Sequence, residues 1–257
     1  MSQANQKNPN RELAMTAKDP SSARAAFGVA WIAGVGASAG LGAALGRRFA
    51  KEGLRVALTG RNVDRVRAVA QEIVAAGGQA FALPGDISSP EEIQRLALDV
   101  KGLGPLRAAV FNVGNAVRGG LLELTPEQFE ATWRGSTYAG FLFSRAALPQ
   151  LLAGGGGSLL FTGATTFFRV GQGLRSLAQS LAREFGPRLV HVAHVVIDGG
   201  VDGERVKSAA REFVAHAGAD GLLNPDSIAE SYWKLHQQHR SAWTHELDLR
   251  PFKEAFE

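Results

Sequence analysis

The most informative residues for chemistry form a glycine-rich segment, GVGASAGLG, at positions 34–42. It lies between a short apolar run, Val29–Ala33, and a stretch with helical spacing of its apolar residues, Leu41–Glu52. Glycines at such a junction let the chain turn tightly. They also let a pyrophosphate approach the helix N-terminus, where amide N–H groups and the helix dipole stabilise negative charge. The strand–loop–helix context therefore favours a phosphate cradle over the alternative, a merely structural turn.

Strand-like and helical stretches alternate along residues 27–257. The predicted strands are Val29–Ala33, Arg55–Thr59, Ala80–Leu83, Leu106–Val113, Ser158–Thr162, Leu189–Ile197 and Ala242–Leu249. The predicted helices are Leu41–Glu52, Asn62–Ala76, one that Ser89 opens, one from Thr125 to about Leu152, Leu174–Phe185 and Pro225–Gln237. Such alternation implies βαβ crossovers. The near-continuous apolar strands are typical of a parallel sheet that helices cover on both faces. The sequence predicts one α/β domain over residues 27–257.

Composition excludes several classes of protein. The chain has 257 residues, a net charge of +4 and no cysteine, which rules out disulfides, thiolate metal sites and a cysteine nucleophile. The basic residues are scattered, so we expect no nucleic-acid partner. No apolar run approaches the roughly 18 residues of a membrane span, and we expect no membrane partner. Residues 1–26 are polar and lack the apolar core of a signal peptide. They predict a disordered tail and a cytoplasmic protein.

The histidines give little support for a metal site. His191 and His194 are three positions apart on a predicted strand and should point to opposite faces of the sheet. His236 and His239 could share a helical face, but two ligands without a nearby carboxylate make a weak site. We therefore predict no metal.

The glycine spacing, Gly36-x-x-x-Gly40-x-Gly42, resembles that of the short-chain dehydrogenase/reductase family. The similarity continues at Asp86-Ile87 after the third strand, at FNVG (111–114) after the fourth and at IDGG (197–200) after the sixth. The resemblance spans residues 27–252 and implies a doubly wound Rossmann sheet of about seven mostly parallel strands. It also implies a nicotinamide dinucleotide at the carboxyl ends of the strands. The cofactor-binding residues that it implies are Gly36, Ser38, Ala39, Gly40, Leu41, Gly42, Asp86, Ile87, Asn112, Val113 and Gly114.

Arg61 bears on the choice of cofactor. A site that prefers NAD places an acid at the end of the second strand for the ribose 2′-OH, whereas a site for NADP places an arginine there for the 2′-phosphate. Arg61 follows the second predicted strand, and the nearest acid, Asp64, is already in the next helix. The sequence therefore predicts a preference for NADP(H), with NAD(H) possible. The alternative is that Arg61 is only a solvated residue at a helix start.

The family's proton-transfer residues are missing. The resemblance implies a Tyr with a Lys four residues later, where the Lys lowers the pKa of the Tyr. The two tyrosines are followed at that spacing by Leu142 and His236, and no Lys lies between Lys101 and Lys207. The relay asparagine position holds Ser136. The interval before Leu174–Phe185 is about a dozen residues shorter than in the family.

This shortening fits a natural non-catalytic member, a truncated allele or a sequence from which residues are missing. Residues that could substitute are Thr162, Thr165, Thr166, Arg169 and Arg175, although arginine is a poor proton donor because it stays charged. The catalytic residues are therefore unknown.

Three functions remain open. The first is an NAD(P)(H)-dependent oxidoreductase acting on a small carbonyl or alcohol. The second is a non-catalytic NAD(P)-binding sensor or partner protein. The third, a methyltransferase on a similar sheet, is disfavoured because Arg61 has the wrong charge to hold the ribose hydroxyls of that cofactor. The resemblance implies a homodimer or homotetramer and a variable substrate lid over residues 202–224.

Overall fold

The computed structural model describes residues 28–114, 122–164 and 172–253. The predicted tail, residues 1–26, lies outside the described residues. The strands are β1 (Val29–Ala33), β2 (Arg55–Thr59), β3 (Gln79–Ala82), β4 (Leu106–Phe111), β5 (Gly157–Ala164), β6 (Val190–Ile197) and β7 (Glu246–Leu249). The helices are α2 (Leu41–Lys51), α3 (Val63–Ala75), α4 (Pro90–Leu103), α5 (Pro126–Trp133), α6 (Ala139–Ala153), α7 (Gln172–Phe185), α8 (Glu204–Ala209), α9 (Arg211–Ala217) and α10 (Pro225–Gln237).

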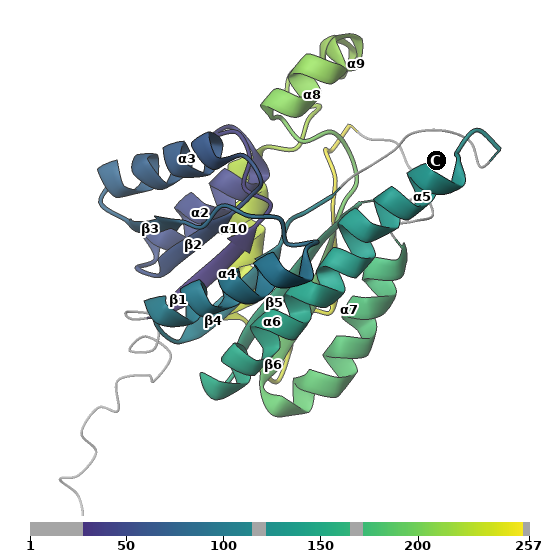
Figure 1. Cartoon of the computed structure of the whole chain (residues 1–257). Helices are drawn as coiled ribbons and strands as arrows, with labels where there is room; N and C mark the ends of the chain where they lie inside the picture. Colours follow the sequence, from purple (N-terminus) through teal and green to yellow (C-terminus); the bar gives the residue numbers. More distant parts are fainter. Residues whose placement is uncertain (1–27, 115–121, 165–171, 254–257) are drawn as a thin grey trace, which may run out of the picture.

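The strands form one seven-stranded sheet in the order β3-β2-β1-β4-β5-β6-β7. Neighbouring strands of this sheet pair in parallel. Helices α2, α3 and α10 contribute buried residues to the core on one face of the sheet, and α4, α6 and α7 to the core on the other (Figure 1). The predicted doubly wound α/β fold is therefore confirmed, and the sheet is more uniformly parallel than predicted.

Local sequence explains why the helices begin where they do. Side chains cap α3, α4 and α5, because Asn62, Ser89 and Thr125 each accept a hydrogen bond from a backbone N–H in the first turn. Thr125 and Gln128 complete a capping box at α5. By contrast, α2 begins at Gly40, which offers no side-chain cap.

The long helix predicted from Thr125 to about Leu152 is present, with one interruption. A π-helical turn at residues Arg134–Tyr138 separates α5 from α6. The hydroxyls of Thr132 and Ser136 donate to backbone carbonyls four residues earlier, at 2.8 and 2.7 Å. Such back-bonding bends helices, and π-turns are frequent at functional sites.

The last strand is shorter than predicted. The structure places β7 at Glu246–Leu249, not at Ala242–Leu249. The indole Nε1 of Trp243 donates to the carbonyl of Gln238, and the backbone N–H of Thr244 donates to the side-chain oxygen of Gln238. The carbonyl of Thr244 meets Nε2 of His191, 2.8 Å away. Trp243 and Thr244 therefore form hydrogen bonds outside the ladder between β6 and β7, and β7 begins after them.

Candidate nucleotide-binding site

The glycine segment closes tightly onto the ends of three strands. The backbone N–H groups of Gly34 and Val35 both donate to the carbonyl of Thr59 at 2.9 Å. Gly34 has φ +92°, and a Cβ at this position would lie 2.0 Å from the carbonyl oxygen of Asn112. A Cβ on Gly42 would lie 2.4 Å from the carbonyl oxygen of Gly34. These two glycines are therefore required by close contacts between backbones.

Gly36 is different, because its missing side chain faces open space. Among the described residues, no atom lies within 4 Å of a Cβ built at Gly36. The helix that follows has no side-chain cap and no acid in its first turn. The carbonyl of Gly40 accepts the N–H groups of Ala43 and Ala44. The earlier N–H groups of Leu41 and Gly42 precede that first intrahelical bond and can meet an anion. A glycine that leaves space beside an uncapped helix start fits a dinucleotide pyrophosphate.

Side chains from α2 and α3 hold the middle of the glycine loop at Ser38. The hydroxyl of Ser38 donates to Oε2 of Glu72 at 2.5 Å, and the Ser38 carbonyl accepts from Nη1 of Arg47 at 2.9 Å. The side chain of Ser38 thus turns toward α3. The carbonyl of Ala39 lies 3.3 Å from the position that a Cβ on Gly203 would take. This contact brings the segment before α8 against the loop.

Arg61 lies beside the glycine loop, after the end of β2. A Cβ on the preceding Gly60 would lie 2.1 Å from the carbonyl oxygen of Val35, so only glycine fits at position 60. Arg61 is exposed and comes directly before Asn62, the cap of α3. Within the described residues no carboxylate pairs with Arg61. Its charge is therefore open to an anionic ligand.

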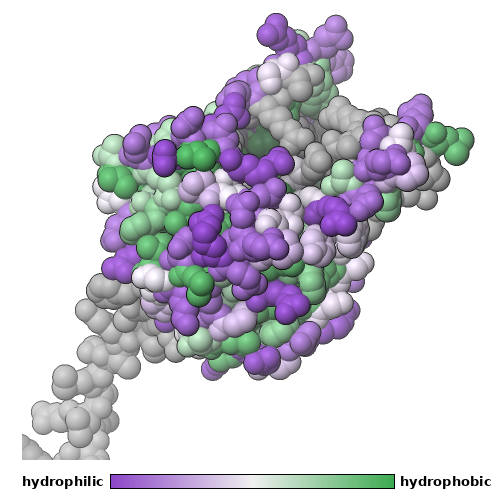
Figure 2. Space-filling model, in the orientation of Figure 1, coloured by the Kyte–Doolittle hydropathy of each residue, from purple (hydrophilic) through white to green (hydrophobic). Residues whose placement is uncertain are grey.

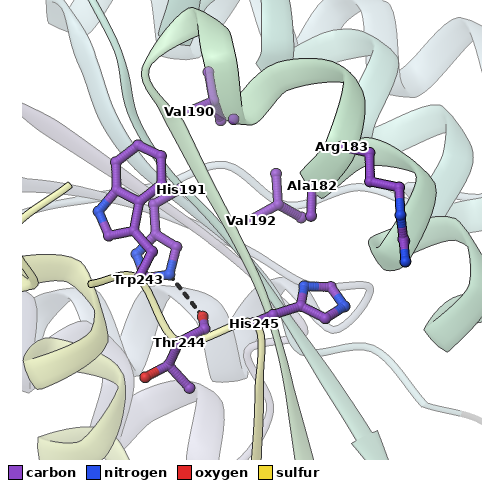
Figure 3. A pocket seen from close by; sticks show the side chains of 9 residues that line it. Ala182, Arg183, Val190, His191, Val192, Trp243, Thr244 and His245 are labelled. Atoms are coloured by element: carbon purple, nitrogen blue, oxygen red, sulfur yellow. Dashed lines mark hydrogen bonds between the residues drawn. The ribbon is translucent and has the colours of Figure 1, made fainter. Parts of the chain in front are cut away.

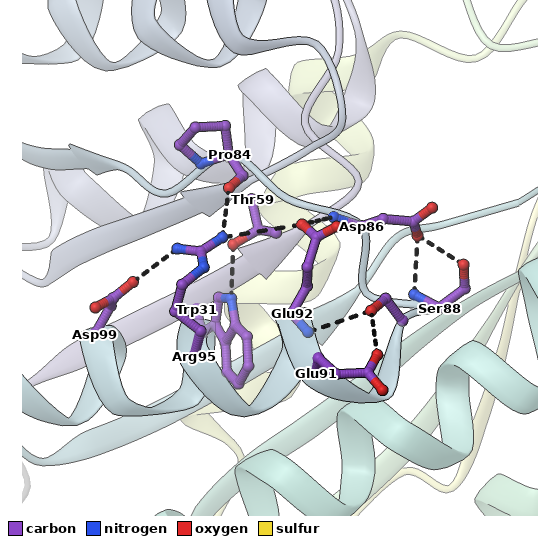
Figure 4. A network of polar contacts seen from close by, with 10 residues as sticks. Trp31, Thr59, Pro84, Asp86, Ser88, Glu91, Glu92, Arg95 and Asp99 are labelled. Atoms are coloured by element: carbon purple, nitrogen blue, oxygen red, sulfur yellow. Dashed lines mark hydrogen bonds and ion pairs between the residues drawn. The ribbon is translucent and has the colours of Figure 1, made fainter.

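Asp86 and Ile87 follow β3 and are fixed by a polar network (Figure 4). The backbone N–H of Asp86 donates to Glu92 at 2.9 Å. Its Oδ1 accepts from the backbone N–H and the hydroxyl of Ser88, at 2.9 and 2.7 Å. Arg95 donates to the carbonyl of Pro84 at 3.0 Å. Ile87 is buried. The network holds this turn in one place, which a binding site for a flat ring requires.

Residues 112–114 lie at the end of β4 and are the last of the predicted cofactor-binding positions. The backbone N–H of Asn112 donates to the carbonyl of Ala33 at 2.9 Å, and its Nδ2 donates to the carbonyl of Gly34 at 3.3 Å. Asn112 therefore joins β4 to the glycine loop. Val113 packs against the core, and no described atom lies within 4 Å of the position that a Cβ on Gly114 would take. Together with the preceding residues, they place all the predicted cofactor-binding positions at the carboxyl ends of β1 to β4.

Both tyrosines contact neighbouring side chains. Tyr232 on α10 is fully buried, and its hydroxyl is 2.6 Å from Oγ1 of Thr162. Burial raises the pKa of Tyr232 well above its ordinary value. Tyr138 lies in the π-helical turn and stacks between Trp133 and Phe141, with ring centroids 5.6 and 6.5 Å away.

Two other polar residues near the expected proton-transfer site, Arg175 and Ser136, already have hydrogen-bond partners. Arg175 pairs with Glu246 through both carboxylate oxygens. Ser136, at the relay position, is buried and donates to a helix carbonyl. Thr165, Thr166 and Arg169 lie outside the described residues.

His194 fills the space beside Gly163, near the end of β5. A Cβ on Gly163 would lie 2.1 Å from Nε2 of His194, so the imidazole occupies the space of any side chain there. His194 is buried, its Nδ1 is 3.3 Å from Oε2 of Glu246, and burial lowers its pKa. As predicted, His194 and His191 face opposite sides of the sheet, because Nδ1 of His191 instead meets the carbonyl of Leu235 on α10. The contact with Gly163 could not be predicted from the sequence, because it depends on the pairing of β5 with β6.

The surface of the molecule has two further features. In Figure 2, hydrophilic side chains cover much of the visible face, and the surface is hollowed beneath α8 and α9. A pocket of about 410 Å³ lies at the amino end of β6, away from the glycine loop (Figure 3). Its lining includes Arg183, His191, Trp243, Thr244 and His245. The Trp243 indole stacks on the His191 ring with centroids 4.9 Å apart.

Two classes of site receive no support. Among the described residues, no group of three or more potential ligands could hold a metal ion. In the same part of the chain, no helix is both long and apolar enough to cross a membrane.

Comparison with known proteins gives a consistent result. A family model described as short chain dehydrogenase matches residues 30–214. A 2,5-dichloro-2,5-cyclohexadiene-1,4-diol dehydrogenase of Sphingobium indicum is 31% identical over 178 residues, which cover 65% of this chain and 71% of that protein. The crystal structure of a short-chain dehydrogenase from Rhodopseudomonas palustris is similar, with a TM-score of 0.73 and 32% identity, and covers 88% of this chain and 99% of its own. A metagenomic short-chain oxidoreductase in complex with NADP has a TM-score of 0.73 and 26% identity, over 90% of this chain and all of that one.

Proposed function

The chain belongs to the short-chain dehydrogenase family, and from this premise we propose that it is an oxidoreductase that binds NADP(H) in preference to NAD(H). Its substrate would be a small carbonyl or alcohol. The observation that carries the proposal is the open space at Gly36 beside the uncapped start of α2. A dinucleotide pyrophosphate requires such a space.

Each part of the cleft has a proposed role. Gly36, Gly40 and Gly42 would hold the pyrophosphate, with the N–H groups of Leu41 and Gly42 donating to it. Arg61 would bind the 2′-phosphate, Asp86 and Ile87 the adenine, and residues 112–114 the adjoining ribose. When bound, the nicotinamide supplies or accepts a hydride.

The preference for NADP(H) is proposed from charge. Arg61 is exposed, follows β2 and has no carboxylate partner among the described residues, so it can meet a dianion. The related metagenomic oxidoreductase crystallised in complex with NADP gives further support. A cytoplasmic location stays a prediction from the sequence.

A second candidate function is non-catalytic binding of the same cofactor, as a sensor or partner protein. The specific observation in its favour is the fate of the tyrosines. The hydroxyl of Tyr232 is fully buried against Thr162, and Tyr138 stacks within the turn between α5 and α6. Neither has a lysine four residues later. Proton transfer by the family's residues therefore has no source in this chain.

The test begins with fluorescence titrations of NADPH and NADH into purified protein of verified mass. Tighter binding of NADPH supports the proposed site, and Arg61→Asp should then lose that preference. Arg67→Asp is a matched control, because Arg67 is also exposed on α3. Absence of binding to either cofactor would refute both functions.

A panel of aldehydes and ketones then separates the two functions. Substrate-dependent oxidation of NADPH supports the oxidoreductase. Binding without turnover, with a cofactor-dependent shift in thermal stability or oligomeric state, supports the sensor.

We also propose a homodimer or homotetramer. Three aromatic residues on α5 and α6, namely Phe129, Trp133 and Phe141, are 51%, 39% and 41% exposed. Exposed apolar side chains that gather on one element often mark an interface. Light scattering coupled to size exclusion measures the mass directly, and a monomer at micromolar concentration would contradict the proposal.

A further inference from the structure

Helix α8 is joined to the nucleotide-binding half of the protein at two points. The backbone of Gly203, the cap of α8, lies against the glycine loop at Ala39 and Gly40. The first residue of α8, Glu204, forms an ion pair with Arg65 on α3, with 3.0 Å between Nη2 and Oε1. In Figure 1, α8 and α9 stand above the carboxyl ends of the strands.

Arg65 lies beside the residue that we propose for the 2′-phosphate. Its backbone N–H donates to the Asn62 side chain at 3.0 Å, which places it in the first turn of α3. Arg61 immediately precedes Asn62, the cap of α3, so Arg61 and Arg65 are four positions apart at the start of this helix. Both arginines are exposed. An anion bound at Arg61 is therefore within reach of Arg65.

We propose that Arg65 is a second ligand of the 2′-phosphate and that Glu204 holds Arg65 until the phosphate displaces it. This inference rests on the proposed function, because it requires an NADP(H) site at Arg61. Helix α8 is then tied to α3 when the site is empty or holds NAD(H), and untied when it holds NADP(H). The chain thereby couples the identity of the cofactor to the segment over the cleft.

The chemistry of the two anions favours this exchange. The side chains of Arg65 and Glu204 are 51% and 56% exposed, and an ion pair between exposed side chains is weak. A phosphate dianion carries more charge and offers three acceptor oxygens, and it would meet two arginines at once. The phosphate should therefore displace a single carboxylate.

Helix α8 also forms an ion pair with the segment just before it, which does not involve α3. Nζ of Lys207 lies 2.8 Å from Oδ1 of Asp202. Loss of the Glu204 contact therefore leaves this tie intact. We expect the start of α8 to loosen and not the whole segment to unfold.

The experiment uses two fragments of the cofactor, so that it does not depend on the nicotinamide. Adenosine 2′,5′-bisphosphate carries the 2′-phosphate, and adenosine 5′-monophosphate lacks it. Calorimetric titrations compare the full chain with Glu204→Gln, Arg65→Gln and the double variant. Glu212→Gln is the matched control, because it removes one negative charge from α9, and Arg67→Gln is the control on α3.

We expect Glu204→Gln to bind the bisphosphate about two- to fivefold more tightly, as the release of an exposed ion pair allows. Arg65→Gln should bind it about tenfold more weakly. Neither variant should change the affinity for the monophosphate by more than about twofold. The double variant should match Arg65→Gln, because Glu204 acts only through Arg65. Hydrogen exchange should be faster at residues 204–209 with saturating NADPH than with saturating NADH.

The outcomes distinguish this inference from the function on which it rests. If the unmodified chain prefers the bisphosphate but Glu204→Gln behaves like Glu212→Gln, the proposed function stands and the displacement of Glu204 is wrong. If Arg65→Gln binds like Arg67→Gln, Arg65 is not a ligand. If the unmodified chain does not distinguish the two fragments, the preference for NADP(H) fails and the inference fails with it.

Discussion

Two glycine substitutions should separate the stability of the fold from the binding of the cofactor. Gly36→Ala places its Cβ in open space, and Gly36 has no positive φ. The free energy of unfolding should change by less than about 0.5 kcal/mol. The same methyl group would stand where the pyrophosphate must approach the loop. We therefore expect at least about tenfold weaker binding of NADPH in a fluorescence titration, a loss of about 1.4 kcal/mol.

Gly42→Ala, unlike Gly36→Ala, should destabilise the fold. Its Cβ would lie 2.4 Å from the carbonyl oxygen of Gly34 and 2.9 Å from Cα of Val35. Overpacking costs about 1–3 kcal/mol, and the better helix propensity of alanine offsets about 0.5–1 kcal/mol. The middle of these ranges gives a net loss of about 1 kcal/mol, which corresponds to a Tm lower by roughly 2–4 °C in a chain of this size. Thermal unfolding followed by circular dichroism measures it. If Gly36→Ala loses as much stability as Gly42→Ala, or binds NADPH normally, the assignment of the cradle is refuted.

Three further predictions concern buried polar groups. Thr59→Val removes the acceptor of the buried Trp31 Nε1–H, 2.9 Å away (Figure 4), and should lower the free energy of unfolding in urea by about 1–3 kcal/mol, while Thr59→Ser should lose less. Gly163→Ser should be strongly destabilising alone and partly rescued by His194→Ala in thermal melts, because the His194 ring occupies that space; an equal loss in both backgrounds would contradict this. Burial lowers the pKa of His236 from 6.5 to about 4, so the unfolded chain takes up the proton first and stability should fall as pH drops from 6.5 toward 4, by up to about 3 kcal/mol; His236→Gln should flatten that slope in urea titrations.

Most of the fold was predictable because most of its signals are local. The bounds of β1 and β2 match the predicted strands, since a strand that helices cover on both faces reads as an uninterrupted apolar run. The starts of α3, α4 and α5 follow from capping residues within one turn. By contrast, α8 and α9 were not predicted, because segments of six and seven residues are too short to show a helical period.

The candidate site also has parts that local sequence predicts and parts that depend on contacts between distant residues. The glycine loop could be identified from spacing, because its function depends on consecutive residues between one strand and one helix. The contact of His194 with Gly163 could not, because it depends on how β5 and β6 align. The Arg65–Glu204 pair joins residues 139 positions apart, and only the folded chain brings them together.

The close contacts of the glycine loop and those at the start of α7 involve different residues, although α7 and the strands that carry the loop share one core. The contacts that shape the cradle join Gly34, Val35, Thr59 and Asn112, and none of them involves α7. At the other half, Gly173 near the start of α7 packs closely on Thr137 in the π-helical turn. The start of α7 therefore packs directly against the π-helical turn before α6. Because the two sets of close contacts share no residue, we predict that the proposed dinucleotide site remains intact although no tyrosine of this chain has a lysine four residues later.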